Sequence, residues 1–243
     1  MRAIVDADPL VYMVGFGHDN MPFKYQCKMM DSFIEDILQS VEATDAKLYL
    51  TGKGNFREEV AQFQRYKGNR DGTHRPRKYR ELRDYLIAVW DAELVEGMEA
   101  DDAVGIDAYR CRDERIDYII CTIDKDLLML EGNHYNYKRK EFDVMSEVET
   151  WRFFFTQMLT GDSSDHIPGL FKVTGTRASK AIKEQLLELS TCVEMAEYVK
   201  KTYMEKGATS EVLKEIATLL WIRRTENGME LERILEIFDS PQA

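Results

Sequence analysis

The chain has 243 residues, and its 44% hydrophobic and 32% charged residues describe an ordinary soluble globular protein with one large domain, or a main domain and a smaller one. No apolar stretch approaches the roughly 20 residues that a membrane helix needs, and Asp6 stands where a signal peptide would continue its apolar run. The four cysteines form no CxxC pair, which excludes a zinc or disulfide framework and indicates reduced thiols in a cytosolic protein.

The net charge of −11 argues at first against an anionic partner, but the charge is unevenly distributed. Between Arg65 and Arg83, eight lysines and arginines stand against only two acidic residues, so the rest of the chain is correspondingly more acidic. A concentrated basic segment beside a concentrated acidic site suggests an anionic substrate, held by the cations and cut through metals bound to the acids.

Short apolar runs alternate with helical patterns through about the first 145 residues. The apolar runs predict strands at 3–5, 47–50, 92–95 and 118–122, with a further short strand near 135–137. The spacing of apolar residues predicts helices at about 30–41 and 79–90, and another that opens at residue 99. Strands that alternate with helices indicate a parallel sheet with helices on both faces.

Acidic residues follow three of these strands. They are Asp6 after the first strand, Glu99, Asp101 and Asp102 after the third, and Asp124 and Asp126 after the fourth. Because the carboxyl ends of parallel strands meet at one edge of a sheet, we expect these carboxylates to converge there. Capping of the helix that opens at residue 99 accounts for two acids but poorly for three, and carboxylates packed this closely repel one another unless cations hold them. The alternative is a solvated acidic helix start.

The pattern becomes wholly helical after about residue 145. A capping box, Ser146 with Glu149, opens a helix that ends before a polar loop at 161–169. Further helices are predicted at about 176–189, 191–205, 210–224 and 229–238, and the aromatic residues Trp151 and Trp221 are interpreted as core. We therefore predict an α/β core at 1–145, with a basic loop or arch at about 65–83, and a helical region at 146–243.

Five short motifs, in this order along the chain, resemble the 5′-nuclease (flap endonuclease) family, and particularly its compact bacteriophage members. They are Ile4-Val5-Asp6, Tyr66-Lys67-Gly68-Asn69-Arg70, Glu99-Ala100-Asp101-Asp102, Thr122-Ile123-Asp124-Lys125-Asp126 and Gly161-Asp162-Ser163-Ser164-Asp165. The resemblance covers roughly residues 6 to 181 and implies a parallel, PIN-like sheet flanked by helices, followed by a helix-three-turn-helix module at about 158–190 that binds DNA.

The resemblance also implies two Mg²⁺ or Mn²⁺ ions. Asp6, Glu99 and Asp101 match acids around one ion, Asp124, Asp126, Asp162 and Asp165 match acids around the other, and Asp102 matches an acid between the two groups. Mg²⁺ prefers carboxylate oxygens, waters and substrate phosphate as ligands. Two such ions, roughly 4 Å apart, can activate a water and stabilise the leaving oxygen of a phosphodiester.

Cationic residues and turns of the same motifs are implied to bind DNA. Lys67 and Arg70 match residues that steer the scissile phosphate, and with Asp102 they form the predicted catalytic set. The predicted DNA-binding residues are Tyr66, Arg75, Arg77, Lys78, Gly169, Gly175, Arg177 and Lys180. We expect Asp71–Lys78 to form a basic loop over a single strand. The resemblance allows a K⁺ ion at the helix-three-turn-helix, although the hairpin after Gly169 is one residue longer and poorer in glycine than in the family.

One acid of the family is absent after the second strand, where Thr51 and Gly52 stand instead. Two interpretations remain open. Asp8 either compensates for the missing carboxylate in the shell of the first metal, or its side chain caps the next segment.

The resemblance implies a metal-dependent 5′→3′ exonuclease and flap endonuclease. Its expected partners are DNA 5′ ends, flaps and duplex junctions, and also RNA paired to DNA, and we expect a monomer in the cytoplasm without membrane association (the host cytoplasm if the chain is phage-encoded). One rival is a DNA-junction-binding protein that has lost the first metal, and with it catalysis, because Thr51 replaces an acid of the family. The other is a haloacid-dehalogenase-like phosphotransferase, in which Asp6 of the Asp6-Ala7-Asp8 motif would be the nucleophile.

Overall fold

The computed structural model describes residues 1–70 and 72–241, which form two compact units. The first comprises residues 1–55, 72–127 and 132–144, and the second comprises residues 56–70, 128–131 and 145–241. The elements of the first unit are β1 (Arg2–Asp6), α1 (Asp8–Gly17), α2 (Phe23–Ser40), β2 (Asp45–Thr51), α4 (Tyr79–Trp90), β3 (Glu93–Val95), α5 (Ala100–Asp113), β4 (Tyr118–Cys121), the 3-10 helix η2 (Lys125–Met129), β5 (Gly132–Asn136) and β6 (Glu141–Met145). The last residues of η2 and β6 belong to the second unit.

The strands form one sheet in the order β3-β2-β1-β4-β5-β6. β1 pairs in parallel with β2 and β4, β2 with β3, and β4 with β5. The turn at 137–140 joins β5 to β6, and because so short a turn connects only antiparallel strands, the β6 edge makes the sheet mixed. The chain builds the sheet outward from β1 in one direction and from β4 in the other. A topological switch point therefore lies between β1 and β4, where ligands of open α/β sheets bind.

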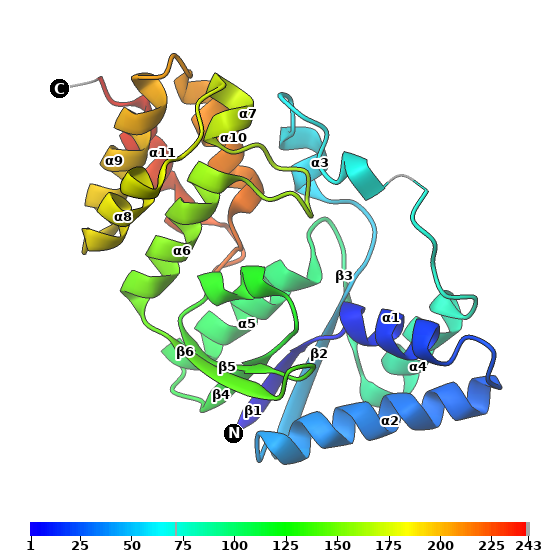
Figure 1. Cartoon of the computed structure of the whole chain (residues 1–243). Helices are drawn as coiled ribbons and strands as arrows, with labels where there is room; N and C mark the ends of the chain where they lie inside the picture. Colours follow the sequence, from blue (N-terminus) through cyan, green and yellow to red (C-terminus); the bar gives the residue numbers. More distant parts are fainter. Residues whose placement is uncertain (71, 242–243) are drawn as a thin grey trace. The chain divides into compact units, whose positions relative to one another are not determined.

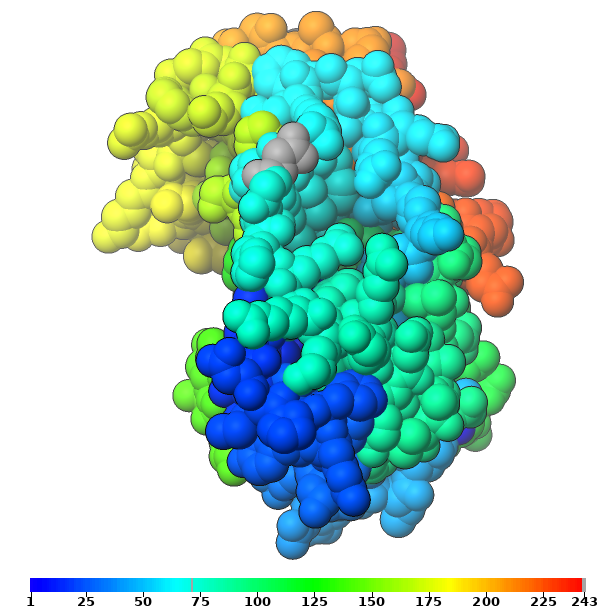
Figure 2. All heavy atoms as spheres, turned by 90° about the vertical axis from the view of Figure 1, so that its right-hand side faces the viewer, coloured from blue at the N-terminus to red at the C-terminus, as the bar shows by residue number. Residues whose placement is uncertain are grey.

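Alternate residues of the central strands face opposite layers of helices. Ala3 and Val5 of β1 face a core that includes residues of α1, α2 and α4. α5 packs on the sheet from the other side, against β1, β2 and β4, and Figure 1 shows these two layers. Figure 2 shows α1 and residues 72–90 as neighbouring blue and teal surfaces of this unit. The predicted α/β class is confirmed, with the correction that β6 makes the sheet mixed and not wholly parallel.

The second unit is helical. Its elements are α3 (Phe56–Val60), the 3-10 helix η1 (Gly68–Arg70), α6 (Glu147–Thr160), α7 (Leu170–Thr174), α8 (Lys180–Glu188), α9 (Cys192–Met204), α10 (Ser210–Leu220), the 3-10 helix η3 (Met229–Leu231) and α11 (Glu232–Asp239). Trp151 stacks on Trp221 with ring centroids 5.5 Å apart, and both are buried. The guanidinium of Arg57, also buried, donates to the carbonyls of Leu219 and Trp221 and so ties α3 to the end of α10.

Most predicted elements are confirmed, with corrected ends. The helix expected from residue 176 begins at Lys180, because the hydroxyl of Ser179 caps it by accepting from the amide of Ile182. The helix expected to run to 224 ends at Leu220. The capping box at Ser146 is present. Helices α1, α3 and α7 and strand β6 were not predicted, and α7 occupies the place of the expected hairpin after Gly169. Among the described residues, we find no helix with the length and apolar character of a membrane span.

Candidate active site

Asp6 ends β1 at the switch point of the sheet and is almost fully buried, with 3% of its surface exposed. Its carboxylate accepts hydrogen bonds from the Thr122 hydroxyl at 3.1 Å and from the Asp8 amide at 3.3 Å. Burial, and then the charges of Asp8 and Asp124, raise the pKa of Asp6 to about 8 in spite of those hydrogen bonds. A nearby cation would relieve both the burial of this charge and the repulsion.

Asp124 and Asp126 follow β4, beside Asp6. The amide of Asp124 donates to the Thr122 hydroxyl at 2.9 Å, and the same hydroxyl donates to Asp6. The amide of Asp126 donates to the carboxylate of Asp124 at 2.9 Å. The carboxylate of Asp126 lies 3.3 Å from the ammonium of Lys125. Thr122, which the sequence analysis did not select as a site residue, therefore links the carboxyl ends of β1 and β4.

Glu99, Asp101 and Asp102 open α5. Glu99 and Asp102 form a capping box, in which the carboxylate of Asp102 accepts from the Glu99 amide at 3.2 Å. Asp102 is fully buried, and Glu99 nearly so. Burial, followed by the charges of Asp6 and of other groups that include Asp101, raises the pKa of Tyr137. Capping thus accounts for two of the three acids, and Asp101 is the third.

The structure shows which groups Thr51 and Asp8 contact, and it excludes the capping interpretation of Asp8. Asp8 does not cap: its carboxylate lies 2.6 Å from the guanidinium of Arg83 and accepts from the Thr51 amide at 3.0 Å. Arg83 also donates to the carbonyl of Thr51, and the hydroxyl of Thr51 accepts from the Ala100 amide at 2.9 Å. Asp8 is therefore a paired carboxylate beside the position of the missing acid. Sequence reasoning missed Arg83 as its partner, because Arg83 was only one of eight cations in the basic segment.

These contacts form a continuous series of hydrogen bonds along the carboxyl edge of the sheet, from Asp124 through Thr122, Asp6, Asp8 and Thr51 to the start of α5. We call this series the acidic edge. The carboxylate and hydroxyl oxygens of the acidic edge fit a hard divalent cation, which would also stabilise the buried negative charge of Asp6. As the side chains stand, no group of three or more His, Cys, Asp or Glu residues within 1–70 and 72–241 is gathered closely enough to hold an ion.

In the second unit, three predicted site residues converge on a fourth. Lys67 lies 3.5 Å from the carboxylate of Asp165, Arg70 forms a direct ion pair with it, and the Tyr66 hydroxyl donates to it at 2.8 Å. Lys67 adopts a positive φ of 50°, and its amide donates to the Asp165 carbonyl at 2.9 Å. The motif at 66–70 and the loop at 161–169 are thus held together.

Asp162 shapes that loop. It is 3% exposed, and its carboxylate accepts from the amide and hydroxyl of Ser164 and from the Asp165 amide. The backbone of Asp162 also pairs with that of Ile167 in an antiparallel bridge. The structure therefore gives Asp162 a turn-forming role.

The described part of the basic loop lies along α1 in the first unit, and Asp71 lies outside the described residues. Pro76 is buried against Gly15, where a Cβ would come within 2.5 Å of the proline ring. The guanidinium of Arg77 lies 3.3 Å from Asp19, and Lys78 donates to the carbonyl of Met21 at 2.6 Å. Arg75 lies over the ring of Tyr79, 4.8 Å from its centroid. Arg77 and Lys78 are thus anchored.

The glycines of the predicted DNA-binding module occupy turns. Gly175 ends α7 in the left-handed conformation, with φ at 74°. Gly169 lies so close to Thr160 and Gly161 that a Cβ would approach backbone atoms to 2.3 Å. Arg177 lies over the Phe171 ring at 5.2 Å, and Lys180 forms an exposed ion pair with Glu184 at 3.4 Å.

Solved structures from bacteriophage T5 share this fold. The T5 D15 flap endonuclease, in a pseudo-enzyme–product complex with DNA and metal ions, superposes with a TM-score of 0.66 at 19% identity, covering 98% of this chain and 99% of that one. T5 5′-exonuclease with bound zinc gives a TM-score of 0.66 at 18% identity, covering 98% and 100%. The chain has the T5 5′-nuclease fold. The resemblance that the five motifs carry is confirmed.

Among curated proteins, the chain is similar in sequence to part of bacterial DNA polymerase I. The polymerase of Lactococcus lactis subsp. cremoris is 27% identical over 224 residues, which are 83% of this chain and 24% of the polymerase. The chain spans between 11% and 24% of the length of the polymerases that it matches. No protein-family profile matches the chain.

Proposed function

We propose that the chain is a metal-dependent 5′→3′ exonuclease and 5′-flap endonuclease that hydrolyses phosphodiester bonds in DNA. The observation that carries this proposal is the acidic edge, which lies at the switch point of a sheet shared with T5 5′-exonuclease and D15 flap endonuclease. T5 structures of this fold hold metal ions and DNA, and the donor chemistry of the acidic edge suits the same kind of ion.

The chain's own residues have distinct parts in this proposal. Two Mg²⁺ or Mn²⁺ ions, held by the eight carboxylates that the family resemblance implies, would supply an activated water and stabilisation of the leaving oxygen. Thr122 holds Asp6 and the segment of Asp124 in register, and the capping box places Asp101 at the start of α5. Lys67 and Arg70 donate hydrogen bonds to phosphate oxygens on which negative charge develops.

Finer points of the substrate belong to the same proposal. In the helix-three-turn-helix module, Arg177 and Lys180 contact the phosphate backbone of a duplex, and Gly169 and Gly175 supply the turns of the module. A K⁺ ion in the module joins this contact with the phosphates. The substrates include 5′ ends, flaps and duplex junctions of DNA, and RNA paired to DNA. The chain acts as a monomer in the cytoplasm.

The test is cleavage of a labelled 5′-flap DNA in Mg²⁺, with an EDTA control. We expect cleavage in Mg²⁺ and none in EDTA. Tight binding of the flap with no cleavage in either Mg²⁺ or Mn²⁺ would favour the non-catalytic junction-binding protein. A covalent phosphate trapped on Asp6 would favour the phosphotransferase. That reaction does not require the additional acids that follow β3 and β4.

A further inference from the structure

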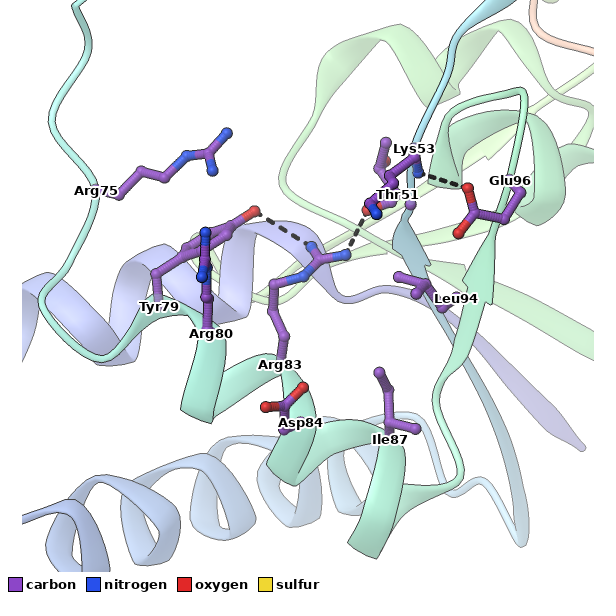
Figure 3. A pocket seen from close by; sticks show the side chains of 11 residues that line it. Thr51, Lys53, Arg75, Tyr79, Arg80, Arg83, Asp84, Ile87, Leu94 and Glu96 are labelled. Atoms are coloured by element: carbon purple, nitrogen blue, oxygen red, sulfur yellow. Dashed lines mark hydrogen bonds between the residues drawn. The ribbon is translucent and has the colours of Figure 1, made fainter.

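A pocket of about 320 Å³ opens beside the acidic edge, within the first unit. It lies between the end of β2, the strand β3 and the first turns of α4, and its volume is within the range of small-ligand sites. Figure 3 shows Arg75, Tyr79, Arg80 and Arg83 arranged along one side, and Leu94 and Glu96 on the other.

Positive charge dominates the lining. Four cations, Lys53, Arg75, Arg80 and Arg83, stand against two carboxylates, Asp84 and Glu96. Arg83 is already paired with Asp8. Within residues 1–70 and 72–241, the side chains of Lys53, Arg75 and Arg80 form no ion pair with an acidic group, and all three are exposed. This charge disfavours a metal ion and favours an anion.

The pocket also offers surfaces for a flat apolar group. Ile87 and Leu94, at 37% and 41% exposure, line it with apolar surface, and the ring of Tyr79 lies beside them under the guanidinium of Arg75. Aromatic and apolar side chains beside arginines form the combination that stacks a base and holds its phosphate. A free inorganic anion would use the arginines but not this apolar part of the lining.

We propose that this pocket binds the 5′-terminal nucleotide of a DNA strand, with the terminal phosphate on Arg75 and Arg80 and the base against the exposed apolar side chains of Ile87 and Leu94. The proposal rests on the proposed nuclease function, which supplies a 5′ end as substrate. Arg83 connects the two sites: it lines the pocket, and it holds Asp8 of the acidic edge. A strand whose 5′ end occupies the pocket therefore lies next to Arg83, which contacts the acidic edge through Asp8.

The test compares two single-stranded oligonucleotides of one sequence, one with a 5′-phosphate and one with a 5′-hydroxyl, by fluorescence anisotropy in EDTA, where no metal-dependent cleavage occurs. We expect the 5′-phosphate to tighten binding by about tenfold, because each charged hydrogen bond to a phosphate oxygen contributes strongly. Arg75→Gln and Arg80→Gln should each reduce this ratio to about twofold or less. Arg139→Gln, which removes an exposed arginine outside the pocket, is the matched control and should leave the ratio unchanged.

Competition separates the sources of the phosphate. Deoxyadenosine monophosphate should displace the 5′-phosphorylated strand from the wild-type protein at lower concentration than inorganic phosphate does. Equal competition by inorganic phosphate would overturn the nucleotide assignment. Equal binding of the two strands, absence of binding of the phosphorylated one, or a ratio that survives both arginine substitutions would overturn the pocket proposal. Failure of the nuclease function is seen separately, as uncut flap DNA in Mg²⁺ whatever the binding ratio.

Discussion

At the scale of single residues, the fold imposes an electrostatic cost on the ionised carboxyl of Asp6, which is buried beside Asp8 and Asp124. A buried carboxyl whose pKa is raised to about 8 binds its proton more tightly in the folded chain than in the unfolded chain. Folding stability in the absence of metal therefore falls as the pH rises from about 4 to about 8. A bound divalent cation removes this cost by pairing with the ionised form.

We accordingly expect Asp6→Asn to be more stable than the wild type in EDTA at pH 8, by about 2–4 °C in Tm. The amide carries no charge to bury, so the advantage should shrink toward pH 4 and shrink again when Mg²⁺ is added at pH 8. Thermal unfolding followed by circular dichroism across this pH range measures it. A Tm difference that does not change with pH would show that the carboxyl of Asp6 is not strained.

A second residue-scale prediction concerns Thr51. Thr51→Asp keeps an acceptor for the Ala100 amide and adds a carboxylate near Asp8 and Arg83. We expect it to lower the Mg²⁺ concentration for half-maximal cleavage several-fold, because one more oxygen ligand strengthens a carboxylate site. Thr44→Asp, an exposed position before β2, controls for added charge. An unchanged Mg²⁺ requirement would mean that Asp8 or water already fills the position.

At the scale of elements, the sequence predicts best where an apolar run or a capping box marks a boundary. β1, β4 and the start of α6 follow from such signals. The helix α1 was missed for two reasons. Most of its own residues are apolar, so they show no helical alternation of apolar and polar positions, and Asp8-Pro9 is also typical of a turn. β6 was missed because it is an exposed edge strand, with Val144 at 70% exposure.

The close approach of two turns gives an element-scale prediction. At Gly169 a Cβ would come within 2.6 Å of three backbone atoms, which cannot rotate away as a side chain can. We expect Gly169→Ala to destabilise the protein by about 1–3 kcal/mol through this overlap. Denaturant unfolding measures the free energy. Gly17→Ala, in open space at the end of α1, is the control and should be neutral or slightly stabilising; equal effects at the two positions would refute the packing argument.

At the scale of the whole molecule, the order of the motifs predicted the fold. The pattern of a strand followed by an acid placed Asp6 and Asp124 together, and their charges do act on each other. Charge counting predicted a basic segment but could not say which cations are engaged. Arg77 and Arg83 proved to be paired with Asp19 and Asp8, whereas Arg80 faces the pocket without such a partner within the described ranges. Pairing depends on contacts between residues far apart in the chain, such as Asp8 and Arg83, which no local pattern reports.

The central claim is that the acidic edge is a metal-dependent nuclease site, and the most direct measurement is paired cleavage and binding by Asp124→Asn/Asp126→Asn. Cleavage of 5′-flap DNA in Mg²⁺ should fall to below about a thousandth of the wild-type rate. Binding of the same DNA in Ca²⁺ or EDTA should stay equal or become tighter, because the two charges repel phosphate when no metal neutralises them. Asp36→Asn/Asp143→Asn, two exposed acids elsewhere in the first unit, should leave both unchanged. Loss of binding in parallel with cleavage, or cleavage at the wild-type rate, would contradict the account.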